Sequence, residues 1–140
     1  PNKYITLEIL EGLALENLEK VSVCIEKLHD QGFSISMDDF GTGYASLTTL
    51  SQLQIDELKL DRSFLMQADQ NTERNRRKIL EVVVEVAKRL NITTVAEGIE
   101  TESHSQLMRD MHCDYGQGYF YSRPIPANEF TKKFLQHNVQ

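Results

Sequence analysis

Residues 36–47 read Ser-Met-Asp-Asp-Phe-Gly-Thr-Gly-Tyr-Ala-Ser-Leu, which joins the end of an alternating segment to two adjacent carboxylates and a glycine-containing loop. Residues 33–38 alternate apolar and polar side chains, as a β-strand with two different faces does. Leu47, Leu50 and Leu53 follow at helical spacing. This stretch therefore predicts a strand, a loop and a short helix, with Asp38 and Asp39 at the carboxyl end of the strand.

The same strand–helix unit recurs along the 140 residues. Strands are expected at 4–10, 33–38, 55–60, 92–96 and, as a short one, near 113–121. Helices are expected at 14–30, at 47–53, over a segment with Ile79, Val83, Val86, Ala87 and Leu90 on its apolar face, after a cap at Thr101, and near 127–137. About five β-α units imply an α/β protein with parallel strands. Two architectures fit this pattern: an open doubly wound sheet, or part of a (β/α)₈ TIM-like barrel.

Charged side chains fall near the carboxyl ends of four of these strands. Because side chains alternate along a strand, Glu8, Asp38, Lys59 and Glu97 are each expected opposite the apolar, helix-facing side. Each of them alone is compatible with an ordinary surface position. Ligand sites of parallel α/β sheets lie at the carboxyl ends of the strands, so their common placement predicts one functional rim.

The composition restricts the function further. A formal net charge of −6 argues against binding to a nucleic-acid polymer, which requires a basic surface. An anionic ligand at an acidic rim would need cations between the two, and metal ions usually supply them. Cys24 and Cys113 are isolated in sequence, so we expect two reduced thiols. The chain starts with Pro1, close to an expected strand, so we expect it to be a piece of a longer protein.

Five motifs together resemble the later half of the EAL domain: Leu-Glu-Ile (7–9), DDFGTGYASL (38–47), KLDRSF (59–64), VAEGIET (95–101) and DYGQGYFYSRP (114–124). This family hydrolyses the bacterial second messenger cyclic di-GMP to linear pGpG. The resemblance implies part of a (β/α)₈ barrel and two Mg²⁺ or Mn²⁺ ions at its rim. Residues 1–140 are expected to form the C-terminal part of a single EAL domain.

The resemblance also implies roles for individual residues. The implied metal ligands are Glu8, Asp38 and Asp39, the implied catalytic residues are Lys59 and Glu97, the implied substrate or water contacts are Glu100 and Gln117, and Glu11 is implied to stabilise the loop that carries the aspartates. Tyr119, Arg123 and Pro124 belong to the last motif. A carboxylate has two oxygens, so Asp38 suits a position shared by two cations, and hard divalent ions prefer such oxygen ligands.

The first half of the family's domain, with its Glu-Ala-Leu signature, is not in this sequence. We therefore expect an active parent phosphodiesterase but an inactive 140-residue piece, which pairs with the missing half or with a second copy. Sensory or GGDEF domains in the parent and a cytoplasmic location are also expected, and tethering to the inner membrane stays open. A degenerate EAL domain that only binds cyclic di-GMP or a protein is the alternative. A phospho-acceptor receiver domain fits less well, because its lysine would lie on the last strand.

Overall fold

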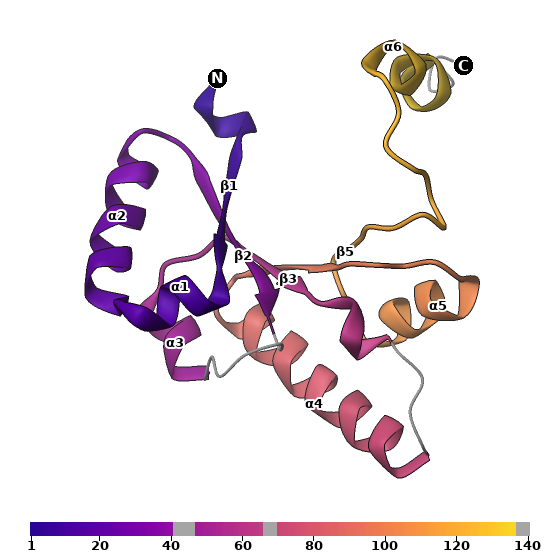
Figure 1. Ribbon diagram of the computed structural model, residues 1–140, viewed down its shortest axis with the longest axis horizontal. Helices are drawn as coiled ribbons and strands as arrows, with labels where there is room; N and C mark the ends of the chain where they lie inside the picture. Colours follow the sequence, from indigo (N-terminus) through magenta and orange to yellow (C-terminus); the bar gives the residue numbers. More distant parts are fainter. Residues whose placement is uncertain (41–46, 66–69, 137–140) are drawn as a thin grey trace.

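The computed structural model describes residues 1–40, 47–65 and 70–136, and its centre is a five-stranded parallel sheet (Figure 1). The strands are β1 (Thr6–Leu10), β2 (Ser34–Phe40), β3 (Glu57–Leu60), β4 (Thr93–Ala96) and β5 (Tyr115–Gly116). Each pairs with the next one along the chain, so the order is β1-β2-β3-β4-β5. Because the pairing is parallel, the carboxyl ends of all five strands lie at the same end of the sheet.

This consecutive order decides between the two predicted architectures. A doubly wound sheet reverses its strand order at a switch point, which places helices on both faces. Here every crossover advances by one strand, and right-handed crossovers then place the helices on one side. The sheet is therefore an arc of a TIM-like barrel, and the open doubly wound alternative is wrong.

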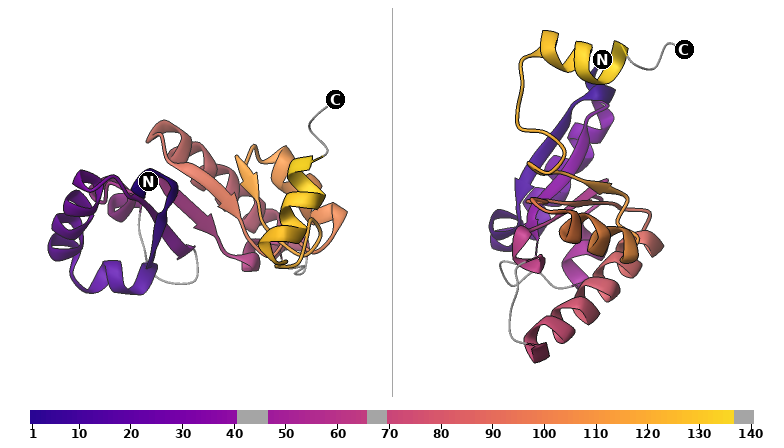
Figure 2. Two further views of the ribbon diagram at one scale, coloured as in Figure 1. Left: turned by 90° about the horizontal axis from the view of Figure 1, so that it is seen from above. Right: turned by 90° about the vertical axis from the view of Figure 1, so that its right-hand side faces the viewer.

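Six helices are described, together with short turns of helix (Figures 1 and 2). They are α1 (Glu11–Glu16), α2 (Leu18–Asp30), α3 (Leu47–Gln52), α4 (Gln70–Arg89), α5 (Glu102–Asp110) and α6 (Ala127–Phe130), which continues as a π-type helix over Thr131–Leu135. The single helix expected at 14–30 is wrong. Asn17 leaves the helical conformation, and its side chain accepts a hydrogen bond from the Lys20 N–H at 3.3 Å, which starts α2 as a separate helix.

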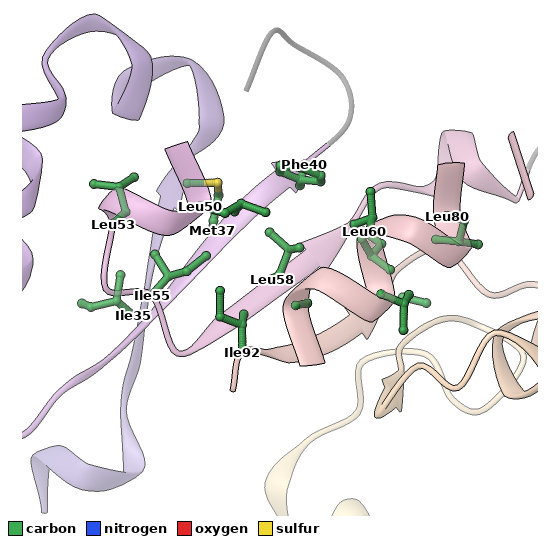
Figure 3. Packing of buried hydrophobic residues seen from close by; sticks show 14 of the residues in the cluster. Ile35, Met37, Phe40, Leu50, Leu53, Ile55, Leu58, Leu60, Leu80 and Ile92 are labelled. Atoms are coloured by element: carbon green, nitrogen blue, oxygen red, sulfur yellow. The ribbon is translucent and has the colours of Figure 1, made fainter. Parts of the chain in front are cut away.

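The hydrophobic core lies between the sheet and the helices. Figure 3 shows side chains of β2 and β3, such as Met37 and Leu58, pointing toward the helical layer. The predicted apolar face of α4 is partly wrong, because Ile79 is 55% exposed whereas Leu80 is 1% exposed. The helix also carries apolar residues outside the buried stripe, so periodicity alone could not decide which stripe faces the sheet.

The last strand and the last helix differ from the expected elements. The strand predicted near 113–121 is only Tyr115–Gly116, and α6 lies away from the sheet after an extended segment (Figure 1). Apolar side chains are exposed close to both edge strands, among them Ile5 and Leu10 at β1 and Tyr115 at β5.

Among the described helices, none combines the length and the hydropathy that a membrane crossing requires.

Candidate metal centre and adjoining pocket

Lys59 on β3 lies at the centre of the charged rim. Its Nζ donates a 2.7 Å hydrogen bond to Glu8 Oε1 and lies 2.8 Å from Glu97 Oε1 and 3.6 Å from Asp38 Oδ1. These carboxylates come from β1, from the residue directly after β4 and from β2. The structure thus brings Glu8, Asp38, Lys59 and Glu97 together, because the four segments that carry them all finish at the carboxyl end of the sheet.

A β-bulge turns both aspartates toward this rim. Met37 pairs with Leu58 and Phe40 pairs with Leu60, so Asp38 and Asp39 both lie opposite Lys59. Asp39 adopts a left-handed backbone conformation with φ of 58°, and its N–H donates to Asp38 Oδ1 at 2.9 Å. In a regular strand two adjacent side chains would point to opposite faces. The bulge instead lets both carboxylates serve one site.

Three carboxylates gather closely enough to share one ligand. One oxygen each from Asp38, Asp39 and Glu97 lies within 4.8 Å of the others. These are hard oxygen donors, the type that Mg²⁺, Mn²⁺ and Ca²⁺ take in proteins. The donor set therefore fits a divalent cation, and Glu8 offers a further carboxylate that contacts Lys59 Nζ.

The charges at this rim do not balance. Glu8, Asp38, Asp39 and Glu97 surround one ammonium, which leaves three negative charges uncompensated among these five side chains. Like charges so close together raise the free energy of the site unless further positive charge arrives. The arrangement thus favours binding of cations.

The same crowding shifts the pKa values of the site. Burial is the main reason that the pKa of Glu97 is raised, and its interaction with Lys59 only partly opposes the shift. Loss of hydration, followed by the charges of Asp38 and Asp61, raises the pKa of Asp39. Burial alone would lower the pKa of Lys59, but its hydrogen bonds to Glu8 and Glu97 outweigh it and raise this pKa. Lys59 therefore stays charged at neutral pH.

Glu11 lies beside this cluster as the first residue of α1. Its side chain is buried, and its charge contributes to the raised pKa of Asp39, which places the two carboxylates near each other. Most of the loop that Glu11 is predicted to stabilise, residues 41–46, lies outside the described residues.

A pocket of about 340 Å³ adjoins the charged rim at Glu97. Glu100 and Gln117, predicted to contact substrate or water, both line it. The Gln117 backbone is held by hydrogen bonds from its N–H to Ala96 O at 2.8 Å and from the Ile99 N–H to its carbonyl at 3.1 Å. The two residues thus lie beside the carboxylate cluster rather than in it.

Sequence reasoning missed two residues of this pocket. Asp61 and Arg62 follow β3 directly and line the wall next to Glu97. Their position directly after the strand that carries Lys59 could have indicated them from the sequence.

Tyr119 lines this pocket and a second one of about 410 Å³, where Arg123 and Pro124 lie. The Arg123 guanidinium stacks on the Tyr119 ring at 4.6 Å.

Comparisons with known proteins identify relatives of this arrangement. The EAL domain model matches residues 1–124. NbdA, a cyclic di-GMP phosphodiesterase of Pseudomonas aeruginosa, is 39% identical over 134 residues, which are 94% of this chain and 17% of that protein.

Two solved structures share the fold. The PaMucR phosphodiesterase of Pseudomonas aeruginosa in complex with c-di-GMP has a TM-score of 0.82 and 35% identity, over 92% of this chain and 51% of that one. A manganese/cy-diGMP complex of Klebsiella pneumoniae BlrP1 has a TM-score of 0.78 and 26% identity, over 88% of this chain and 31% of that one.

The chain is much shorter than these relatives. It spans 15 to 17% of the first curated relatives and about half of the PaMucR structure. The family model nevertheless covers most of its length, with the acidic pair, Lys59 and the 95–101 motif all inside the matched residues. The chain therefore belongs to the EAL domain family.

Proposed function

We propose that this chain is the C-terminal part of an EAL-type phosphodiesterase that hydrolyses cyclic di-GMP to linear pGpG with two divalent cations, Mg²⁺ or Mn²⁺. The observation that carries the proposal is the placement of Lys59 Nζ among Glu8, Asp38 and Glu97, with Asp39 turned toward them by the bulge. The names of the relatives support the substrate, and the BlrP1 complex supports a divalent cation.

Each residue has a proposed part in this reaction. Asp38 would be shared by both cations, Asp39 would bind the second, and Glu8 would bind the first. Bound cations would supply Lewis acidity and neutralise charge on the phosphodiester. Lys59 would orient the attacking water through its Nζ, and Glu97, which already accepts from that Nζ, would take up the proton. Glu100 and Gln117 would contact the substrate in the pocket beside Glu97.

The isolated chain is proposed to be inactive. Its five strands form an open arc, so the rim is surrounded on only part of its circumference. The exposed apolar residues near β1 and β5 are proposed to pack against the first half of the domain, or against a second copy where that half is absent. Sensory or GGDEF domains in the parent and a cytoplasmic location stay predictions.

Hydrolysis by the complete domain tests the function. The domain is incubated with cyclic di-GMP and Mn²⁺ or Mg²⁺, and pGpG is measured by chromatography beside the 140-residue piece at equal concentration. We expect pGpG from the complete domain, none after EDTA, and none from the piece. Binding of cyclic di-GMP without pGpG would favour a degenerate binding domain, and turnover by the piece alone would contradict its inactivity.

A further inference from the structure

The Tyr121 side chain connects α5 with the segment that follows β5. Its hydroxyl oxygen lies 2.8 Å from the Oγ of Ser105 on α5, and Ser105 is 1% exposed. A Cβ built at Gly116, the last residue of β5, would lie 3.2 Å from the Tyr121 hydroxyl oxygen and 3.3 Å from the Cε2 of its ring. The ring therefore lies against the backbone of β5, and the hydrogen bond with Ser105 anchors it there.

Gln117 directly follows this contact, and its backbone is bound to the turn after β4. The Gln117 N–H donates to Ala96 O at 2.8 Å, and its carbonyl accepts the Ile99 N–H at 3.1 Å. A Cβ built at Gly118 would overlap the backbone nitrogen and carbonyl oxygen of Ile99, so only glycine fits at this position. The segment that carries Gln117 thus touches the backbone of this turn directly.

The turn after β4 carries Glu97, so it links Gln117 to the charged rim. Glu97 Oε1 lies 2.8 Å from Lys59 Nζ. The next residue, Gly98, has a φ of +69°, and a Cβ built there would lie 2.5 Å from the Cβ of Arg62. The turn therefore packs both on the residues that follow β3 and on the segment that follows β5, and the place of Glu97 relative to Gln117 depends on these contacts.

We propose that Tyr121 is a positioning residue: anchored by Ser105, it holds the segment after β5 against the turn at 97–99 and so fixes Gln117 relative to Glu97. This inference rests on the proposed function, in which Glu97 takes up a proton and Gln117 contacts the substrate. It adds a side chain outside the charged rim, and a helix, α5, on which the geometry of the site depends.

Two mutant cycles in the complete domain test this role through kcat/KM for cyclic di-GMP. The first combines Tyr121→Phe with Ser105→Ala. Tyr121→Phe should lower kcat/KM about 3- to 10-fold, the effect of one lost hydrogen bond on a positioned group. Ser105→Ala should have a similar effect, and the double variant should fall no further, because both changes remove the same bond. Tyr4→Phe removes a hydroxyl from a tyrosine that is 78% exposed and should stay within about twofold of the unaltered domain.

The second cycle combines Tyr121→Phe with Gln117→Ala. If Tyr121 acts through Gln117, its replacement should change kcat/KM less than about twofold once the Gln117 side chain is absent. A bond that only stabilises the fold would lower kcat/KM by the same factor in both backgrounds. Melting temperatures of all variants show which assay temperature leaves each of them folded.

Hydrogen exchange provides a measurement that does not require turnover. The N–H groups of Gln117 and Ile99 donate across the contact that Tyr121 is proposed to hold. Their exchange should become about 3- to 10-fold faster in Tyr121→Phe, whereas the amides of β2 should exchange as in the unaltered domain.

Three outcomes would overturn the inference. They are an unchanged kcat/KM in Tyr121→Phe, an equal fall with and without the Gln117 side chain, and unchanged exchange at Gln117 and Ile99. Failure of the proposed function is distinguishable, because the unaltered domain would then hydrolyse no cyclic di-GMP. The exchange rates would still show whether Tyr121 holds Gln117 in place.

Discussion

The two ends of this parallel sheet both carry carboxylates, but these carboxylates have different surroundings at each end. At the amino end, Asp56 precedes β3 and accepts the Ile35 N–H at 2.7 Å, and Asp114 precedes β5 and accepts the Thr94 N–H at 2.8 Å. At the carboxyl end, Asp38, Asp39 and Glu97 crowd one another around Lys59. The first carboxylates have backbone partners and hold strands together, whereas in the second set Asp38 and Glu97 share the Lys59 ammonium with Glu8.

Backbone polarity explains this difference. Chain segments at the start of a parallel strand offer N–H groups, which a carboxylate from the neighbouring connection accepts. Segments at the carboxyl end offer C=O groups, which cannot donate to a carboxylate. Acidic residues there need a cation from a side chain or from solution. This is why acidic side chains at the carboxyl ends of strands indicate a site more strongly than those at the amino ends.

The largest effect is expected from Lys59→Met in the complete domain. Hydrolysis of cyclic di-GMP should fall by about 100-fold or more, because the group that orients the attacking water is lost. Initial rates of pGpG formation measure this effect. Lys88→Met on the exposed side of α4 is the matched control, and a Lys59 variant with near-normal turnover would contradict the assigned role.

Removal of Asp114 should affect stability instead of activity. Asp114→Ala leaves the buried Thr94 N–H and hydroxyl without their 2.8 and 2.9 Å partner, so the free energy of unfolding should fall by about 1–3 kcal/mol. Urea unfolding measures the change, and Glu26→Ala on exposed α2 surface is the control. If activity fell while stability stayed unchanged, the contrast between the two ends would be wrong.

Asp39→Asn should stabilise the metal-free domain at neutral pH. The pKa of Asp39 is raised by folding, so its ionised form is less favourable in the folded than in the unfolded state. This penalty is full above the folded pKa and vanishes as pH falls below the ordinary value near 3.8. Urea unfolding in EDTA should therefore show a gain at pH 7 that shrinks toward pH 4.

With added Mn²⁺ the unaltered domain should instead be more stable than Asp39→Asn. The asparagine variant lacks the negative carboxylate that would bind the cation. The same unfolding curves with Mn²⁺ measure the reversal. Equal stabilisation of both proteins by Mn²⁺ would count against Asp39 as a ligand.

The smallest effect is expected from His29→Gln. His29 Nε2 lies 2.9 Å from Asp56 Oδ2, but both side chains are partly exposed, so the loss should stay below about 1 kcal/mol. Asp56→Ala should cost more, because it also removes the partner of the Ile35 N–H. If thermal unfolding ranked the two variants the other way, the imidazole pair rather than the backbone bond would hold this end of the sheet.

The sequence predicted much of the secondary structure correctly, but the prediction failed where contacts between distant parts of the chain decide the structure. Alternation of apolar residues located four strands, and Thr101 was identified as the helix cap that its 3.2 Å bond to the His104 N–H shows it to be. It misplaced the buried stripe of α4, where Leu80 rather than Ile79 faces the core. It also predicted a longer strand than Tyr115–Gly116, whose extent depends on pairing with β4.

The sequence by itself determined the β-α alternation and the position of acidic residues and Lys59 at strand ends, because both follow from local periodicity and chain polarity. Only the tertiary structure decided that the strands pair in consecutive order, that a bulge turns Asp39 to the same side as Asp38, and that Arg62 lies across Gly98. Strand order, the bulge and this contact depend on residues from separate strands, and periodicity within one segment carries no information about them.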